Sequence, residues 1–193
     1  MVIIYVGENL DLGKEIIENL NNFLNNIDKL LIMGVGNTLK GDDGVGIEFI
    51  HNLINYYSNK YNISNNKEIN KINNKIVFLN CGVVPENFTD VIKKENPSHI
   101  IIYDAALMGE IPGTLKIIKL DNISSVGFST HALPMNIIIK YINSFIDTQI
   151  LIIGIEPEQL EFGNKLSKKI YKKNEKFIKL IIKYIDSILE NEQ

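Results

Sequence analysis

Two adjacent carboxylates in a glycine-rich loop are the first residues of this chain whose types and spacing suggest chemistry. Asp42 and Asp43 lie within residues 29–46, where a short apolar run ends and a helical pattern begins. A strand, a glycine loop and a helix in this order are typical of an α/β domain that binds a ligand at its strand ends. Each aspartate also suits a structural role as a turn residue or a helix N-cap. The loop is therefore a candidate site whose ligand must be decided from its residue types.

These residue types exclude the two common nucleotide-binding motifs. A dinucleotide fingerprint needs a third glycine where Leu39 stands and an acid about 20 residues after the loop, where residues 52–55 carry none. A phosphate-binding loop needs Lys and then Ser or Thr at the positions of Asp42 and Asp43. Because two carboxylates would repel a polyphosphate, the loop suits a cation, a proton or a peptide.

Two further residues occupy positions where α/β domains place ligands. Asp104 closes the apolar run 100–103, a predicted buried strand, and His131 precedes a predicted helix over residues 132–146. Together with Asp43 they supply two carboxylates and one imidazole, a set that suits a divalent first-row metal ion. Taken singly, each acid also fits a cap or a salt bridge, and the histidine fits a surface or core position.

The other histidines and the single cysteine fit ordinary structural roles. His51 lies on a predicted helix and His99 at a strand start. Cys81 follows a strand, and as the only cysteine it forms neither an internal disulfide nor a cysteine metal cluster. The sequence also lacks the motifs of serine hydrolases, zinc proteases and cysteine proteases. The chain therefore offers no obvious protein nucleophile.

Length and composition favour a cytoplasmic α/β protein. The 193 residues, 45% of them hydrophobic, are enough for a substantial core. No apolar run reaches the roughly 18 residues of a membrane span, and the N-terminus lacks the positive region of a signal peptide. The net charge is −3, and all 20 basic residues are lysine, so nucleic-acid binding is not expected.

Hydrophobic periodicity predicts one α/β domain over residues 29–193, preceded by a leader, residues 1–28, that contains a short strand and a helix. The predicted strands of the domain are 30–35, 76–80, 99–103, 113–120 and 149–155, and the predicted helices are 45–57, 85–94, 132–146 and 164–190.

Three details of this pattern make specific predictions. The eight residues 105–112 are too few for a parallel crossover, so one antiparallel strand is expected in an otherwise parallel sheet. The Asn- and Lys-rich stretch 58–75 is expected to be a solvated connection. In the helix over 132–146, one face is expected to carry a row of large apolar residues, namely Leu133, Ile137, Tyr141 and Phe145.

Five ordered segments resemble the nickel–iron hydrogenase maturation endopeptidases, in particular the branch that matures hydrogenase 3 and its archaeal relatives. The resemblance runs from about residue 30 to residue 182 and leaves out the leader. The segments that carry it are GVGNTLKGDDGVG, CGVVPENFTD, IIYDAALMGEIPGT, STHALPMN and GIEPEQLEFGNKLS.

The resemblance implies a single three-layer α/β domain with a twisted, mostly parallel five-stranded sheet and helices on both faces. Such proteases are expected to be monomers that remove a short C-terminal peptide from the hydrogenase large-subunit precursor after nickel insertion. The nickel arrives with the precursor, and the protease ligands implied for it are Asp43, Asp104 and His131.

The catalytic role of these residues is open at this stage. Asp43 or Asp104 is a candidate general base for an attacking water, while the metal polarises nearby groups. The metal could instead only dock the precursor and position the scissile bond. The alternative function is a nickel-binding hydrogenase assembly chaperone on the same fold, which would bind the precursor without cutting it.

Overall fold

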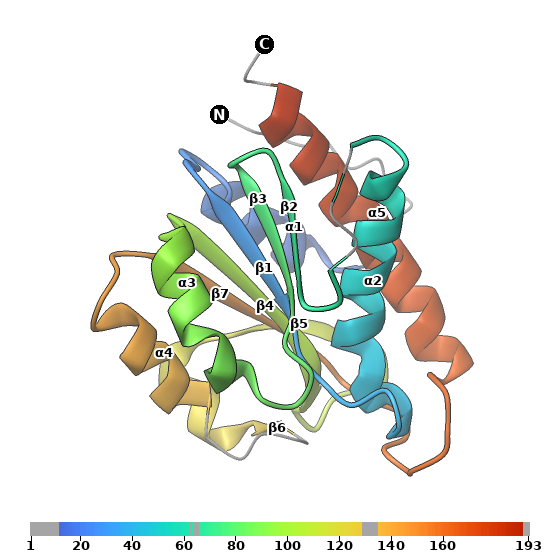
Figure 1. The fold of residues 1–193 in the computed structure, drawn as a ribbon. Helices are drawn as coiled ribbons and strands as arrows, with labels where there is room; N and C mark the ends of the chain where they lie inside the picture. The colour runs from blue at the N-terminus through green and yellow to red at the C-terminus, as the bar shows by residue number, and fades with distance from the viewer. Residues whose placement is uncertain (1–11, 62, 64–65, 129–134, 191–193) are drawn as a thin grey trace.

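A β-sheet with helices on both faces forms the centre of the computed structural model, which describes residues 12–61, 63, 66–128 and 135–190 (Figure 1). The strands lie in the order β2-β3-β1-β4-β7-β5, and β6 pairs with the end of β4. Strands β3, β1, β4 and β7 are parallel, whereas β2, β5 and β6 run antiparallel to their partners. The strands are β1 (Leu30–Gly34), β2 (Ile69–Ile72), β3 (Ile76–Asn80), β4 (His99–Leu107), β5 (Leu115–Ile118), β6 (Gly127–Phe128) and β7 (Gln149–Ile155).

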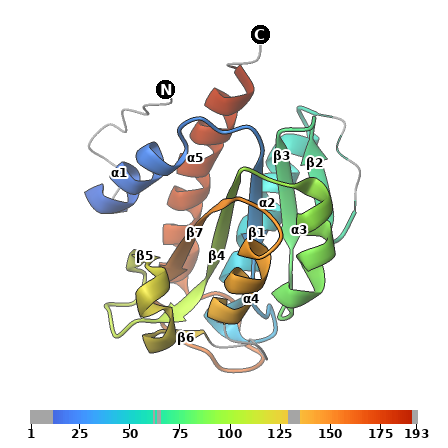
Figure 2. The same cartoon turned by 90° about the vertical axis from the view of Figure 1, so that its left-hand side faces the viewer.

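The helices cover the two faces of the sheet in separate groups. Side chains of α1, α2 and α5 pack in one apolar cluster, and those of α3 and α4 pack in a second cluster on the other face. Figure 2 shows α3 and α4 in front of the sheet and α2 and α5 behind it. The helices are α1 (Lys14–Phe23), α2 (Val45–Ser58), α3 (Thr89–Glu95), α4 (Met135–Asn143) and α5 (Lys168–Glu190), with short 3-10 turns η1 (Gly41–Gly44), η2 (Pro85–Phe88) and η3 (Leu120–Ser125).

These observations confirm the predicted α/β class, with its mostly parallel sheet and helices on both faces. The predicted antiparallel strand is β5, which pairs with β7. One prediction was wrong, because the Asn- and Lys-rich stretch contains β2, an edge strand paired with β3. The strand path therefore contains six strands where five were expected, with β6 beside it.

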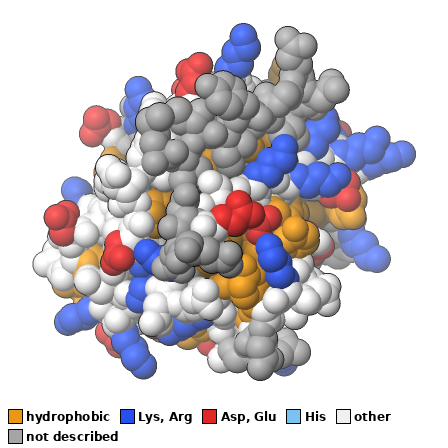
Figure 3. All heavy atoms as spheres, turned by 90° about the horizontal axis from the view of Figure 1, so that it is seen from above, with side chains coloured by type: hydrophobic (Ala, Val, Ile, Leu, Met, Phe, Trp, Pro, Cys, Tyr) orange, Lys and Arg blue, Asp and Glu red, His pale blue; other side chains and the backbone are white. Residues whose placement is uncertain are grey.

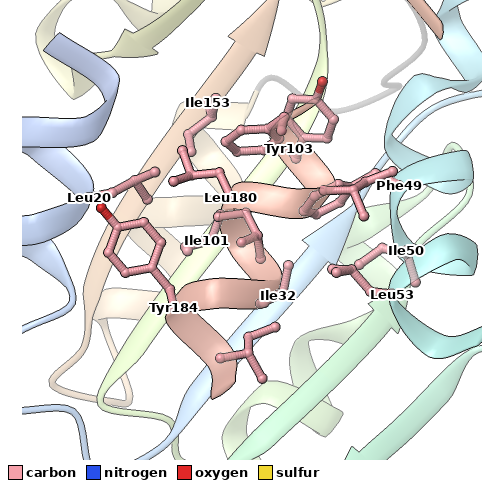
Figure 4. Close-up of a cluster of buried hydrophobic side chains, with 14 of the residues drawn as sticks. Leu20, Ile32, Phe49, Ile50, Leu53, Ile101, Tyr103, Ile153, Leu180 and Tyr184 are labelled. Carbon is pink, nitrogen blue, oxygen red and sulfur yellow. The ribbon is translucent and has the colours of Figure 1, made fainter. Parts of the chain in front are cut away.

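Strand β1 is buried on both sides, which is why it appears in the sequence as a continuous apolar run. Its alternate side chains point into opposite layers, with Ile32 in the cluster of α1, α2 and α5 and Met33 in that of α3 and α4. Figure 4 shows Ile32 beside residues of α2 and α5, where Phe49 and Tyr184 are fully buried. The centre of the sheet is thereby a rigid base for the loops that leave it.

The helix of the N-terminal leader is part of this packing. In α1, Ile16 and Leu20 are buried in the same cluster as Tyr184 of α5. The Tyr184 hydroxyl donates a hydrogen bond to Asn21 Oδ1 at 2.8 Å, and burial raises the pKa of Tyr184 to about 12. The strand expected before this helix lies outside the described residues.

Helix α4 packs on the sheet through a different row of residues from the apolar row noted in the sequence. The buried residues of this helix are Met135, Ile138, Ile139 and Ile142, whereas Ile137 and Tyr141 are about half exposed. Phe145 follows the helix and is only partly buried, and Leu133 lies outside the described residues. The helix is apolar on most of its circumference, so periodicity alone did not identify the face that packs on the sheet.

The strand order creates a switch point between β1 and β4. From β1 the chain crosses to β3 by way of α2, and from β3 it returns past β1 to β4 by way of α3 on the other face. In open α/β sheets the crevice at the carboxyl ends of such a strand pair is where ligands bind. Among the described residues, no helix is long and apolar enough to cross a membrane.

Candidate functional site

Asp43 lies at the carboxyl end of β1, in the 3-10 turn η1 that leads into α2. Its side chain is fully buried, and its Oδ2 accepts a hydrogen bond from the backbone N–H of Asn37 at 2.9 Å. The Asn37 N–H also lies 3.2 Å from the Asp43 carbonyl oxygen. The loop thus folds back on itself and holds this carboxylate in a defined position at the end of the sheet.

Gly36 lies next to both the Asp43 backbone and the Asp104 carboxylate. A Cβ atom at Gly36 would lie 1.8 Å from the Asp43 carbonyl oxygen and 3.7 Å from Asp104 Oδ1. The backbone of Gly36 also has a φ of +139°, which disfavours residues with a side chain. Only glycine allows this close approach, so Gly36 is required for the loop to pack against the Asp43 backbone next to Asp104.

Asp104 lies inside β4 and not at its end, which corrects the predicted strand boundary. Strand β4 continues to Leu107, but its pairing with β1 stops where Gly34 meets Tyr103. Just after this pairing, the N–H of Val35 donates a hydrogen bond to the Tyr103 carbonyl oxygen at 3.1 Å. Asp104 is therefore the first β4 residue beyond the point where β1 turns away, and its side chain is fully buried.

The neighbouring Tyr103 is buried, and its burial affects the pKa of its hydroxyl. Its ring packs against Phe49 and Phe177, with ring centroids 4.7 and 4.9 Å away. Burial, together with the charge of Asp104, raises the pKa of the Tyr103 hydroxyl well above its ordinary value. Tyr103 is therefore neutral at physiological pH and does not serve as a proton acceptor.

Asp42 has a different role from its neighbour, although the sequence does not distinguish them. Its Oδ2 accepts hydrogen bonds from the backbone N–H groups of Glu158 and Gln159, each at 2.9 Å, and its Oδ1 accepts one from Ser167 at 2.6 Å. These donors lie in the loop between β7 and α5, which meets the loop after β1 at the lower right of Figure 1. Asp42 is thus a structural acid that joins two loops.

The third predicted metal ligand, His131, lies outside the described residues. Within residues 12–61, 63, 66–128 and 135–190, no group of three His, Cys, Asp or Glu side chains is arranged to hold a metal ion. The structure therefore brings together the two predicted acids, Asp43 and Asp104, and does not test the imidazole.

The residues with predicted structural roles occupy ordinary positions. His99 is buried at the start of β4 with its Nδ1 2.9 Å from Ser98 Oγ, and burial lowers its pKa. The His51 ring lies 3.1 Å from the Asn80 side-chain amide. Cys81 is buried, and burial raises the pKa of its thiol, so it is poorly suited to act as a nucleophile.

Sequence reasoning missed one buried acid at this end of the sheet. Glu156 follows β7, and its Oε2 accepts hydrogen bonds from the backbone N–H groups of Met108 at 2.7 Å and Glu110 at 3.1 Å. It thereby holds the loop that follows β4. An acid directly after an apolar strand was the available signal, the same one that identified Asp104.

Comparison with known proteins identifies relatives of this chain. Residues 61–184 match the family model described as hydrogenase maturation protease. A Methanocaldococcus jannaschii protein named as a hydrogenase maturation protease is 41% identical over 171 residues, which cover 89% of this chain and 96% of that protein. The hydrogenase 3 maturation protease of Escherichia coli is 27% identical over 141 residues, which cover 72% of this chain and 80% of that protein.

A solved structure shares the fold. The crystal structure of the [NiFe] hydrogenase maturation protease HycI from Thermococcus kodakarensis KOD1 superposes with a TM-score of 0.72 at 25% identity, and the match covers 87% of this chain and 99% of that one. With its α/β fold, its paired acids at the β1–β4 switch point and these matches, the chain belongs to the hydrogenase maturation protease family.

Proposed function

We propose that this protein is an endopeptidase that removes a short C-terminal peptide from the precursor of a nickel–iron hydrogenase large subunit after nickel has been inserted. The observation that carries the proposal is that two buried acids, Asp43 and Asp104, lie beside Gly36 at the carboxyl end of the sheet. In this proposal the nickel belongs to the precursor, and the protease recognises it through Asp43, Asp104 and His131.

The donor set suits this role. Two carboxylates and an imidazole bind a divalent ion such as nickel while leaving positions for ligands from the precursor. The nearest described residue before His131 is Phe128, which pairs with Ala106, two residues beyond Asp104 on β4. Two residues, Ser129 and Thr130, separate Phe128 from His131, so the histidine follows closely in sequence after a strand that pairs with β4.

The same acids provide a route to peptide hydrolysis. Asp43 or Asp104 accepts a proton from a water molecule that attacks the scissile carbonyl, and the proton is then available to the leaving amine. The precursor's nickel holds the scissile bond close to this carboxylate, which lowers the entropic cost of reaching the reactive geometry. Neither step needs a nucleophilic side chain, which agrees with the buried, protonated Cys81.

A processing assay tests the proposal. The protein is mixed with nickel-loaded and nickel-free large-subunit precursor, and the intact mass of the precursor is followed. We expect loss of a C-terminal peptide from the loaded precursor only. Binding without loss of mass would contradict the protease and favour an assembly chaperone, and equal cleavage of both precursors would contradict the nickel signal.

Substitutions at the acids and the histidine test the assignment of residues. We expect Asp43→Asn and His131→Ala to lower the processing rate by roughly 100-fold or more, because each removes a group that acts on nickel or on the attacking water. Asp28→Asn is the matched control, since Asp28 lies two residues before β1, at the other end of the sheet, and its side chain is exposed. Processing at the wild-type rate by either variant would exclude that residue from the site, provided that thermal unfolding shows a folded protein.

A further inference from the structure

A groove of about 290 Å³ lies directly beside Asp43 and has no part in the metal site. Its walls come from the loop after β1, from α2, and from the loop and helix that follow β7. The lining residues are Thr38, Gly41, Gly44, Glu48, Lys165, Leu166 and Tyr171. Because Gly44 follows Asp43 in the chain, the Cα atoms of these two residues are about 3.8 Å apart. The wall of the groove therefore begins one residue after Asp43 in the chain.

The two loops that form the groove are fixed to each other. Besides the three N–H groups that donate to the Asp42 carboxylate, the N–H of Asp42 donates to the Gln159 carbonyl at 3.0 Å. The N–H of Gly41 donates to the Asn164 carbonyl oxygen at 3.2 Å, and the N–H of Gly163 donates to the Leu39 carbonyl oxygen at 2.9 Å. The groove is thus preformed, so a ligand would lose little free energy in ordering its walls.

Large apolar side chains are exposed on the same two loops and on the helix beside them. Leu39 is 68% exposed, Phe162 is 74% exposed, and Tyr171 in the groove is 47% exposed. Exposed apolar residues that gather at one place mark interaction sites, and aromatic residues contribute most at such interfaces. Glu48 and Lys165 add one charge of each sign, so the groove selects for apolar contact more than for net charge.

We propose that this groove binds an apolar side chain of the hydrogenase precursor within two or three residues of the scissile bond. The inference rests on the proposed function, because the scissile bond is placed next to Asp43. An extended peptide advances about 3.3 Å per residue, so a segment held at Asp43 reaches the groove within that number of residues. Leu39 and Phe162 then cover the bound segment from the outside, and Asp42 acts as a positioning residue that keeps the two loops together.

A matched pair of tyrosine substitutions tests the groove. Tyr171 and Tyr141 are 47% and 55% exposed, but Tyr141 lies on α4, on the other face of the sheet. We expect Tyr171→Ser to weaken binding of the large-subunit precursor by roughly tenfold, as loss of an interface aromatic does. Tyr141→Ser is expected to bind like wild type, and Tyr171→Phe, which keeps the ring, is expected to retain most of the affinity.

Calorimetric titration with the precursor, with nickel and without it, measures these affinities independently of cleavage. Equal affinities of Tyr171→Ser and Tyr141→Ser for the precursor would overturn the proposal that the groove binds it. Failure of the wild-type protein to bind either precursor would overturn it as well. Thermal unfolding of each variant shows whether it is folded. Mass analysis of the same mixtures tests cleavage separately. A protein that binds the precursor through Tyr171 and never cleaves it would refute the proposed function, whereas the proposed role of the groove in binding would stand.

Discussion

The two ends of the β-sheet hold their buried carboxylates in different ways. At the amino end, Glu95 of α3 forms ion pairs with Lys29 and Lys71, and Figure 3 shows Lys and Asp or Glu side chains intermingled on this side of the molecule. At the carboxyl end, the carboxylates of Asp42 and Glu156 accept hydrogen bonds from backbone N–H groups. An ammonium group cancels the charge of its partner, whereas a backbone N–H satisfies an oxygen and leaves the charge in place.

This difference has a consequence for function. The backbone donors satisfy the carboxylate oxygens of Asp42 and Glu156 without placing a cation between them and the candidate site. Four acidic side chains, Asp42, Asp43, Asp104 and Glu156, thus gather at the carboxyl end, an arrangement that supports the proposed binding of a cation there. The amino end, with its paired charges, has no such preference and serves stability. Substitutions that remove charge but keep shape separate these two ways of holding a carboxylate.

The largest expected effect on stability is that of Asp42→Asn. Both carboxylate oxygens of Asp42 accept backbone N–H groups, so the amide nitrogen of an asparagine would face a donor from either orientation. We expect the free energy of unfolding, measured with urea, to fall by about 3 kcal/mol. Glu158→Gln is the control, because this exposed residue bonds Asp42 only through its backbone. Equal stability of the two variants would contradict the structural role of Asp42.

The difference between Asp42 and Asp43 also marks a limit of the sequence. The Asp-Asp pair after an apolar strand predicted an acidic loop at the end of the sheet, and the structure places both acids there and buries them. Which acid faces the site depends on N–H groups more than 100 residues away, at Glu158 and Ser167. Local patterns carry no information about such partners, so the separate roles of the two acids required the structure.

The same limit explains the errors in the fold. Continuous apolar runs predicted the parallel strands, because strands buried on both faces must be apolar throughout. Strand β2, Ile69–Ile72, has two adjacent polar residues between its isoleucines and lies in an Asn- and Lys-rich stretch, so no local pattern predicts it, and it is a strand because β3 pairs with it. In α4, the row containing Ile137 and the row containing Ile138 are both apolar, so only contact with the sheet decides which one is buried.

A smaller loss is expected for Glu156→Gln. Only Oε2 of Glu156 accepts the N–H groups of Met108 and Glu110, so a glutamine can keep both bonds through its single carbonyl oxygen. We expect the free energy of unfolding to fall by about 1 kcal/mol, because the bonds lose their charge-assisted character. Hydrogen exchange at Met108 and Glu110 reports the same bonds directly. A loss as large as that of Asp42→Asn would mean that both oxygens of Glu156 are needed.

The smallest effect, and the one that depends on pH, is expected for Glu95→Gln at the amino end. Burial alone would raise the pKa of Glu95, but hydrogen bonds and charge from Lys71 and Lys29 outweigh it and hold the pKa below its ordinary value. Because the pKa of Glu95 is lower in the folded state, its carboxylate stabilises the fold at pH values above the pKa that Glu95 has in the unfolded chain. This contribution is lost as the pH falls through the folded-state pKa.

Wild type is therefore expected to exceed Glu95→Gln in free energy of unfolding by about 0.5 kcal/mol at pH 7, since both lysines remain partly solvated. The difference should shrink at pH 3 and in high salt, which screens the ion pairs. Glu175→Gln on the exposed face of α5 is the control for a general charge effect. A difference that stays constant from pH 7 to pH 3 would show that Glu95, like Asp42, is held by its geometry and not by its cations, and the contrast between the two ends of the sheet would then be lost.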